Sequence, residues 1–496
     1  MAHKKEAHFQ CFLSLLTLRL FVVFFSKPYE NPTFSERAAK RGEISPTFFR
    51  RFRCTSYLII KSPNKTKKKG EVHINNTINY LGFEENMFEE FQIEEDVKEI
   101  TAHVKLKRLL NQTCIHCKSK NIKIKDYKIK TINHKHFTGK QCFIKYKQRR
   151  YFCVECKKSF YEHNPFSFSN ESVSAETVLY ILDELKTTQS FKSVALKTGL
   201  SQKKVVQIFD KYVDIPREPI PKILGIDEFH YKSTGDEKYA CILINNTPEN
   251  PTIVDIIKDR KIDTLSYYFQ YIDRKERENV NFFVSDMYDG YKYVHDVWFP
   301  SSIHIIDTFH FIRLFTDAIN RIRIKVMKEY HKDSDEYYIL KKYYFVLEMS
   351  KKKFKTKKVF FKKFGKEMNY YDLLNLVINV DERIRQAYFI KDSFCSSYWK
   401  YSFDESFNFI NNIVSKLKNS PFEEYHSVAD SLVRWKQEIC NSYLLVGGKR
   451  ITNARTEGFN NLVKVIKRCG YGYSNFKRFR NRILHIQKSN NKLKLY

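Results

Sequence analysis

The sequence predicts a multidomain α+β protein, because its 496 residues are too many for one compact hydrophobic core. A cysteine-containing module comes first, followed by a short helical stretch, a strand-rich region and a long charged region of helical character. Hydrophobic residues make up 42% of the chain and aromatic residues 16%, which is enough to build several cores.

The formal net charge of +32 predicts a polyanionic partner, since a solvated surface needs no such excess. Nucleic acid and a membrane surface are the two candidates. Nucleic acid is favoured, because acidic residues suited to binding metal accompany the positive charge. No membrane association is expected, since no run after residue 86 is long and uncharged enough to span a bilayer.

Residues 1–86 are expected to be a poorly structured extension that need not belong to the native protein. The apolar run over residues 11–25 resembles a signal peptide, but Arg19 interrupts it and no small-residue cleavage site is evident. Met87 is a more ordinary start.

Residues 87–165 are predicted to form a zinc-binding module. Segments 122–130 and 142–152 alternate apolar and basic residues, which predicts two strands of a zinc-ribbon-like hairpin with a basic face. Two Cys-x-x-Cys pairs flank these segments, and four thiolates complete a tetrahedral site for one structural Zn²⁺. The expected ligands are Cys114, Cys117, Cys153 and Cys156.

Two alternatives remain open for this module. The four cysteines could be free and buried, although two correctly spaced pairs in a polar module favour zinc. Three histidines could replace a cysteine as ligand but are expected at the surface: His116, His134 and His136.

Residues 170–215 are predicted to form a helix-turn-helix domain. Ser174 and Ser201 have the character of helix N-caps, and Gly199 suits the turn between the second and third helices. An ordinary helical hairpin is the alternative. In the helix-turn-helix interpretation the start of the last helix faces DNA with Gln202, Lys203 and Lys204.

Residues 220–310 are predicted to hold the first part of an α/β sheet of the ribonuclease H type. Strands are expected at residues 223–231, 238–244, 252–257, 280–285 and 303–306, with helices near 262–271 and 288–297. The first strand should be central, since its apolar run is nearly continuous.

Residues 311–450 are predicted to be an all-helical insertion, and residues 451–496 the last part of the core with basic C-terminal helices. The insertion contains the densest basic run of the chain, residues 351–363. This run is either a solvated helix face or a surface that contacts DNA.

Three acidic residues have the character of a metal-binding site. Asp227 and Asp286 each end or interrupt an apolar run that reads as a buried strand, and Glu457 lies on a predicted helix. A buried carboxylate is costly unless a cation meets it, and oxygen ligands of this kind suit Mg²⁺. Glu228 should point to the opposite face of its strand, and Asp289 should begin a helix.

Five short motifs follow one another in order along residues 90–485: Gly225-Ile-Asp-Glu-Phe, Ser285-Asp286 with Tyr291, Asp307-Thr-Phe-His310, Asn453-Ala-Arg-Thr-Glu-Gly-Phe-Asn-Asn, and the basic tail from Lys467. They resemble those of bacterial insertion-sequence transposases of the Asp-Asp-Glu class, ISL3 type. The resemblance implies a zinc-binding N-terminal domain, a helix-turn-helix and a ribonuclease H-like core with a helical insertion.

The resemblance also implies an activity and its residues. Such an enzyme binds the terminal inverted repeats of its element and uses two Mg²⁺ or Mn²⁺ ions to cleave and join DNA. Asp227 would bridge both ions, Asp286 would hold one and Glu457 the other. Asp307 and His310 would lie beside the metals, unless they are an N-cap and a packed histidine. DNA contacts would extend to Lys467 and Arg468, and Arg455 and Asn460 would touch phosphate or hold the glutamate.

The expected partners are double-stranded DNA, as element end and as target, and further copies of the chain on paired ends. The expected location is the bacterial cytoplasm, at the nucleoid. Two other functions stay open: a transposase-derived DNA-binding protein without catalysis, and a structure-specific metal-dependent nuclease that does not join strands. The acidic triad argues against the first, and the predicted recognition domains argue against the second.

Overall fold

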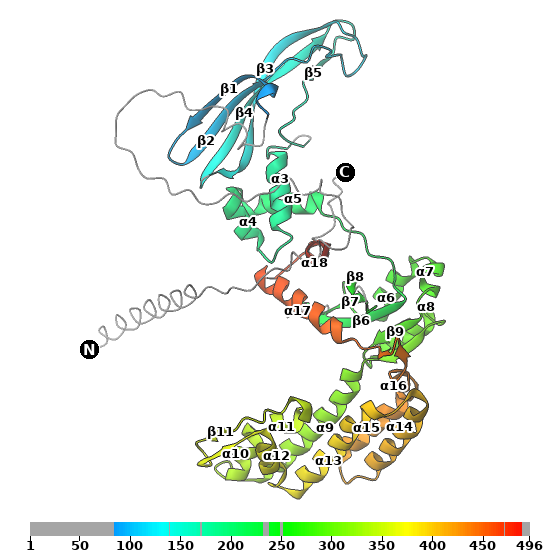
Figure 1. Ribbon diagram of the computed structural model, residues 1–496. Helices are drawn as coiled ribbons and strands as arrows, with labels where there is room; N and C mark the ends of the chain where they lie inside the picture. Colours follow the sequence, from blue (N-terminus) through cyan, green and yellow to red (C-terminus); the bar gives the residue numbers. More distant parts are fainter. Residues whose placement is uncertain are drawn as a thin grey trace, which may run out of the picture. The chain divides into compact units, whose positions relative to one another are not determined.

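The computed structural model describes residues 84–488, apart from residues 138, 169–170, 232–237, 249–250 and 471 (Figure 1). The expected extension over residues 1–86 lies almost wholly outside this range, as does the end of the basic tail. In the described part of the chain, no helix is both long and apolar enough to cross a membrane.

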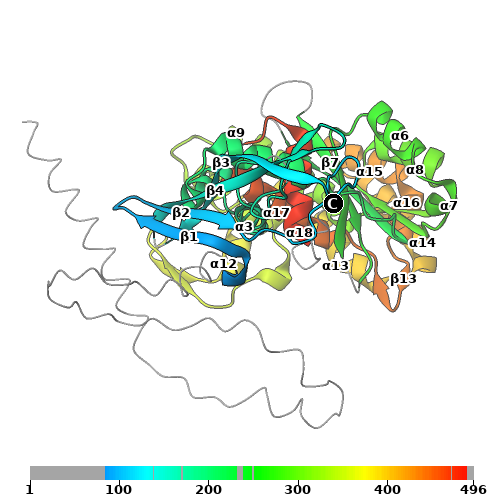
Figure 2. The ribbon, with the colours of Figure 1, turned by 90° about the horizontal axis from the view of Figure 1, so that it is seen from above.

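The first described region is a five-stranded sheet whose strands β1 to β4 run alongside one another (Figures 1 and 2). Its order is β1-β2-β4-β3, with β5 paired to β4, and only β2 and β4 are parallel. The expected hairpin is β3 with β4, but both strands are longer than predicted, and β1 and β2 were not predicted. The strands are β1 (Phe88–Glu95), β2 (Glu99–Leu106), β3 (Ile122–Phe137), β4 (Lys140–Cys153) and β5 (Ser159–Tyr161).

Three helices follow, α3 (Ala175–Glu184), α4 (Phe191–Thr198) and α5 (Gln202–Tyr212). The hydroxyl of Ser174 accepts a hydrogen bond from the backbone of Thr177, and that of Ser201 from Lys204, so both predicted N-caps are present. Gly199 ends α4 at φ 68°, a left-handed conformation that glycine adopts at low cost.

The second sheet has the order β10-β9-β6-β7-β8, so the first strand in sequence is central as predicted. It is antiparallel to β7, as β7 is to β8, and parallel to β9, as β9 is to β10. The predicted strand positions are confirmed within two residues: β6 (Ile223–His230), β7 (Tyr239–Asn245), β8 (Thr252–Ile257), β9 (Phe282–Ser285) and β10 (Ile303–Ile306).

Helices pack on both faces of this sheet. One face carries α6 (Ile262–Gln270) and α8 (Asp289–Trp298), whose Leu265 and Tyr291 join Ile226 in one buried cluster. The short helix α7 (Arg274–Glu278) was not predicted. The opposite face carries α17 (Ala454–Cys469) and α18 (Phe476–Gln487), which bury Val463 and Phe479 against Ile242.

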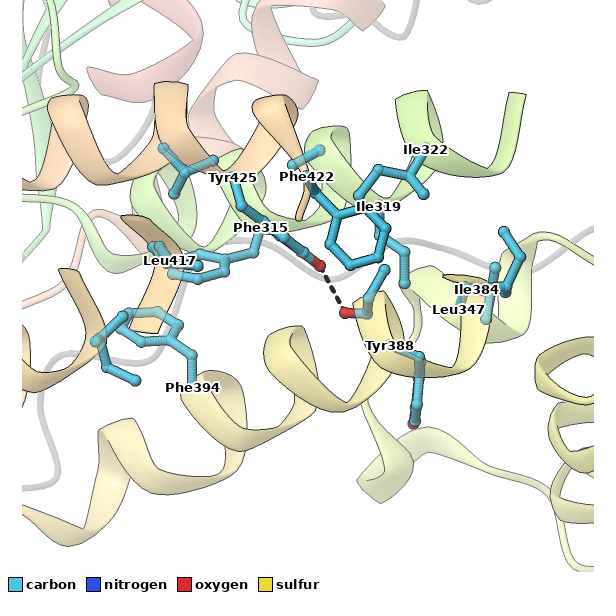
Figure 3. Packing of buried hydrophobic residues seen from close by; sticks show 14 of the residues in the cluster. Phe315, Ile319, Ile322, Leu347, Ile384, Tyr388, Phe394, Leu417, Phe422 and Tyr425 are labelled. Atoms are coloured by element: carbon cyan, nitrogen blue, oxygen red, sulfur yellow. Dashed lines mark hydrogen bonds between the residues drawn. The ribbon is translucent and has the colours of Figure 1, made fainter. Parts of the chain in front are cut away.

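The region between β10 and α17 is mainly helical, with its own aromatic core. Phe315 stacks on Phe394 with ring centroids 4.1 Å apart, and the hydroxyl of Tyr425 donates to the carbonyl of Ala387 at 2.6 Å (Figure 3). The helices are α9 (Thr308–Glu329), α10 (Asp335–Lys342), α11 (Phe345–Glu348), α12 (Tyr370–Ile378), α13 (Glu382–Ser397), α14 (Phe403–Lys418), α15 (Glu423–Arg434) and α16 (Lys436–Asn441).

The prediction that this insertion is all helical was wrong. Two hairpins interrupt it, β11 (Val359–Phe361) with β12 (Lys366–Met368), and β13 (Leu445–Val446) with β14 (Lys449–Arg450). Their turns contain Gly365, Gly447 and Gly448, all at positive φ, which a helix does not allow. The basic run therefore forms a short 3-10 turn and then a strand instead of a helix face.

The last described helix, α18, contacts both the second sheet and the three-helix region. Gln487 accepts from the backbone of Ile253 on β8 and donates back to its carbonyl. Arg482, which is 1% exposed, donates to the carbonyls of Thr187 and Gln189 at 2.8 and 2.7 Å. These contacts fix the three-helix region against the sheet.

Candidate functional site

Asp227 lies on the central strand β6, with its side chain held from two sides. Oδ1 accepts the backbone N–H of Glu228 at 2.8 Å, and Oδ2 accepts Nδ2 of Asn460 at 2.9 Å. Burial raises the pKa of this carboxyl above its usual range, against the lowering effects of the Glu228 N–H and of nearby His310. The hydrogen bonds to Asp227 therefore offset only part of the free-energy cost of burying its ionised carboxylate.

Asp286 follows directly after β9, the strand parallel to β6, and lies level with Asp227. Gly225 pairs with Val284, and each aspartate follows two residues later. Burial, together with the charges of Glu228 and Asp227, raises the pKa of Asp286 to about 7. Its Oδ1 is buried and has no hydrogen-bond partner among the described residues. Both observations indicate a position where a cation would be favourable.

Glu228 points to the other face of β6, as expected from strand alternation. Its carboxylate pairs with Arg260, whose guanidinium lies 4.7 Å from the ring centroid of Tyr239 and 4.8 Å from that of Tyr288. Arg260 also lowers the pKa of Asp286. Arg260 is therefore a cation within electrostatic reach of Asp286 that the sequence did not reveal.

The start of α17 is fastened to the sheet at several points. The backbone N–H of Asn453 donates to Oδ1 of Asp307 at 3.0 Å, and Asn246 donates to the carbonyl of Thr452 at 2.8 Å. A Cβ on Gly225 would come within 2.9 Å of Oδ1 of Asn453, so glycine is what permits this approach. The helix is thereby held close to β6.

Glu457 lies in the first turn of α17 and is exposed. Asn460 follows three residues later, on the same side of the helix, and is half-buried against Asp227. The side chain of Arg455 lies outside the described part of the structure. The helix thus brings Asn460 to the first aspartate and presents the glutamate to solvent beside it.

Asp307 and His310 lie at the junction of β10 and α9. Asp307 occupies the N-cap position of α9, but its Oδ1 takes the N–H of Asn453 and no side-chain cap bond to α9 forms. Burial raises its pKa, while Asn453 and then His310 lower it. His310 lowers the pKa of Asp227 as well, so the imidazole lies within electrostatic reach of both carboxylates.

These residues gather at one edge of the sheet without closing into a finished ligand cluster. Among the described residues, only one group of three or more cysteine, histidine or acidic side chains has ligand atoms within 4.8 Å of one another, and it is the cysteine group. A divalent cation fits the acidic edge nonetheless, since its donors are hard oxygens and one of them is buried without a partner. Asp227, Asp286 and Glu457 are the side chains that would hold it.

The four predicted cysteines do form one cluster. Sγ of Cys114 lies 3.6 Å from Sγ of Cys156, and Sγ of Cys117 lies 3.5 Å from Sγ of Cys153. A tetrahedral site with Zn–S bonds of about 2.3 Å requires sulfurs about 3.8 Å apart, which is close to these distances. Each pair is followed by a lysine at positive φ, Lys118 at 61° and Lys157 at 55°, which closes the knuckle.

The three histidines are not part of this cluster. His116 is exposed, as expected. The expectation of a surface position was wrong for His134, which is 1% exposed because its ring contacts the N-cap of α3, with Nδ1 2.8 Å from Oγ of Ser174. Burial lowers the pKa of His134 to about 4. His136 lies half-buried against Gly199.

The predicted DNA-contacting residues differ in their availability. Gln202, Lys203 and Arg468 are exposed. Lys204 is paired with Glu171 at 2.9 Å, and Lys467 donates to the carbonyl of His230 at 3.0 Å. The last two side chains therefore already have partners within the protein.

Sequence reasoning named Asn460 as a residue that touches phosphate or holds the glutamate, but it did not give its hydrogen bond to Asp227, and it gave no role to Asn453. Asn453 and Asn460 belong to the same short motif as Glu457, so their proximity to it was visible. Their partners, Asp307 and Asp227, were not, because 146 and 233 residues separate them in the chain.

The comparisons with known proteins agree with this geometry. A family model described as a transposase of the ISL3 type matches residues 224–483, just over half of the chain. A second model, described as the zinc-finger of transposase IS204/IS1001/IS1096/IS1165, matches residues 111–156 and so covers all four cysteines. None of the curated proteins matches this chain.

The fold, the cysteine cluster and these matches define a DNA transposase with a zinc-ribbon module. The chain belongs to the ISL3 family of insertion-sequence transposases. Binding and breaking of DNA are the activities expected of that family.

Proposed function

We propose that this transposase cleaves and joins DNA at the terminal inverted repeats of its insertion sequence, with Asp227, Asp286 and Glu457 as its metal-binding acids. The observation that carries the proposal is that Asp227 on β6 lies level with Asp286, which directly follows the adjacent parallel strand β9. The strand order β10-β9-β6-β7-β8, with only β7 reversed, is that of a ribonuclease H-like core and supports the same assignment.

Two Mg²⁺ or Mn²⁺ ions, when bound, would activate the attacking oxygen and stabilise the leaving one. The protein's own residues prepare that site. Asp227 and Asp286 supply oxygens at one edge of the sheet, and Asn460 fixes the orientation of Asp227. Glu457 lies one turn before Asn460, so the same tether keeps its carboxylate on this side of the helix. His310 is within electrostatic reach of both Asp227 and Asp307, and we assign it the role of orienting a phosphate.

DNA recognition is assigned to the α4–α5 pair as a helix-turn-helix, and to the zinc module. Two caps and a left-handed glycine at the turn support the helix-turn-helix assignment, and Gln202 and Lys203 are exposed at the start of α5. The remaining parts of the proposal are the domain limits at 87–165, 170–215, 220–310, 311–450 and 451–496, assembly of several copies on paired ends, and action on the bacterial nucleoid.

The test uses the full chain with duplexes that carry the terminal repeats, assayed for nicking and strand joining in Mg²⁺. Asp227→Asn, Asp286→Asn and Glu457→Gln should each abolish both reactions while leaving binding of the ends nearly unchanged. Asp289→Asn is the matched control, because Asp289 lies three residues beyond Asp286 but is exposed and paired with Arg434.

Three results would lead elsewhere. Cleavage retained in two of the three variants would show that these acidic residues are not the metal-binding residues of the active site. Hydrolysis without joining in the unaltered protein would indicate a nuclease instead. Binding of the ends without any cleavage, in Mg²⁺ and in Mn²⁺, would indicate a DNA-binding protein derived from a transposase.

A further inference from the structure

Only one of the two polar atoms in the Asn460 side-chain amide has a hydrogen-bond partner among the described residues. Nδ2 donates to Oδ2 of Asp227 at 2.9 Å. Oδ1 is buried and has no hydrogen-bond partner among the described residues. The amide cannot turn over, because Oδ1 would then face the carboxylate of Asp227, and two acceptors repel one another.

An acceptor buried without a partner is unfavourable, and each such atom in a folded protein needs an explanation. A second buried acceptor is Oδ1 of Asp286. Asn460 is hydrogen-bonded to Asp227, and the negative charge of Asp227, along with burial, raises the pKa of Asp286. Each of these two side chains has one buried oxygen without a partner among the described residues. Amide and carboxylate oxygens are the ligands that hard divalent cations take in proteins.

The position of Asn460 on α17 distinguishes it from the acid of the same helix. Glu457 is exposed, whereas Asn460 is half-buried against the sheet. Asn461, the next residue, is exposed and points to another side of the helix. Of these three oxygen-bearing side chains, Asn460 is the one whose contact with Asp227 the structure records.

We propose that Asn460 is an oxygen ligand of the divalent cation that Asp227 holds. Its Nδ2 aligns the carboxylate of Asp227, and its Oδ1 would be a ligand of the cation when one is bound. This inference rests on the proposed function of the acidic edge. Asn460 is a neutral ligand, whereas the other three proposed ligands are carboxylates: Asp227, Asp286 and Glu457. The site would therefore carry one negative charge fewer than a site of four carboxylates.

The test measures Mn²⁺ binding to the full-length protein by electron paramagnetic resonance, without DNA and with the zinc site filled. Asn460→Leu keeps the volume and removes both polar ends, and should weaken Mn²⁺ binding about tenfold or more. Asn460→Asp keeps an oxygen and adds charge, and should bind Mn²⁺ at least as tightly as the unaltered protein. Asn461→Leu and Asn461→Asp are the matched controls and should leave the affinity unchanged.

Thermal unfolding gives a second readout. Asn460→Asp sets two carboxylates against each other, so its melting temperature should fall without Mn²⁺ and recover when Mn²⁺ is added. Asn460→Leu should show little such recovery.

The outcomes separate this inference from the assignment of the acids. Unchanged Mn²⁺ affinity in Asn460→Leu would overturn it. Equal weakening in Asn460→Asp and Asn460→Leu would also overturn it, since the amide would then act only through its hydrogen bond to Asp227. If Asp227→Asn and Asp286→Asn also bind Mn²⁺ normally, the acidic edge as a whole is not the metal site, and the proposed function fails with it.

Discussion

Asn460 on α17 donates a hydrogen bond to Asp227 on β6 although 233 residues separate the two in the chain. The contact joins the motif of the first aspartate to that of the glutamate across the whole helical insertion. The backbone of Asn453 makes a parallel connection to Asp307. Changes that shift the start of α17 should therefore affect the chemistry at β6 before they affect the binding of DNA.

Gly225→Ala should test the fit between β6 and α17. The added Cβ would lie 2.9 Å from Oδ1 of Asn453, a residue only 4% exposed, so this side chain or the start of α17 must shift, at a cost of about 1–3 kcal/mol. Strand cleavage should fall while end binding, measured by gel shift, stays near normal. Gly458→Ala on α17 meets nothing within 4 Å and serves as the control, which should be neutral or slightly stabilising. Full cleavage by Gly225→Ala would show that this approach is not needed.

Mn²⁺ binding should depend on pH through Asp286. Its pKa is raised to about 7, so a proton competes with the cation below that pH. The apparent affinity, followed by titration calorimetry, should fall about tenfold from about pH 8 to about pH 6. Asp289→Asn should keep this slope. An affinity independent of pH over this range would mean that Asp286 does not contact the cation.

The same carboxyl should give the cation-free protein an unusual stability profile. Its pKa is higher in the folded than in the unfolded chain, so the folded state binds more protons between about pH 4 and about pH 7. Stability from this group is therefore present at low pH and lost as pH rises toward 7. Saturating Mn²⁺ should reduce the loss, which chemical denaturation at several pH values would measure.

The cysteine cluster should hold one zinc per chain. Cys117→Ser removes a thiolate from the cluster and should lower the zinc content measured by mass spectrometry to near zero, with loss of ordered structure over β3 and β4. Cys395→Ser lies outside the cluster and should leave the zinc content unchanged. A folded zinc-free module would contradict the assignment.

Glu171 should restrain the DNA affinity of the three-helix region. It pairs with both Lys204 and Lys211, so Glu171→Gln should free two cations and strengthen binding to any duplex. Lys203 is exposed, and Lys203→Ala should weaken binding more than Lys204→Ala does. Gel shifts with terminal-repeat and scrambled duplexes at two salt concentrations would measure this, with loss of a phosphate contact reducing the salt slope by about one. Equal effects of the two lysine changes would argue against the assigned face.

Arg482 should couple the three-helix region to the sheet. Arg482→Leu leaves the carbonyls of Thr187 and Gln189 without their donor and should lower the free energy of unfolding by about 2–4 kcal/mol. Calorimetry should then show the three-helix region melting separately. Lys477→Ala removes an exposed pair with Asp214 and should change stability by at most about 0.5 kcal/mol. A single transition at the original temperature in Arg482→Leu would show that α18 does not couple the two.

The parts of this fold that local signals determine could be predicted from the sequence. Apolar runs bounded by charged residues located the five strands of the second sheet, and Ser174, Gly199 and Ser201 located the caps and the turn of the three-helix region. The cysteine spacing located the one cluster of metal-ligand side chains found among the described residues.

The parts that depend on distant partners could not be predicted. β1 is rich in glutamate, and its own sequence gives no signal that it pairs with β2 at the edge of a sheet. His134 appeared to be a surface residue because its buried environment comes from Ser174, 40 residues away. The same applies to Asn460, whose partner became visible only once β6 and α17 were placed side by side.

The hydrogen bond between Asp307 and Asn453 joins two segments that are synthesised at different times. All five strands of the second sheet have been synthesised when Asp307 emerges, but Asn453 is made 146 residues later. At synthesis rates of roughly 5–20 residues per second, that interval is roughly 7–30 s. Throughout this interval, the nascent chain contains Asp227 and Asp286 but lacks α17 with Glu457 and Asn460. A product that ends within the insertion would contain the zinc module and the three-helix region but not Glu457. Under the proposed assignments it would therefore bind element ends without cutting them.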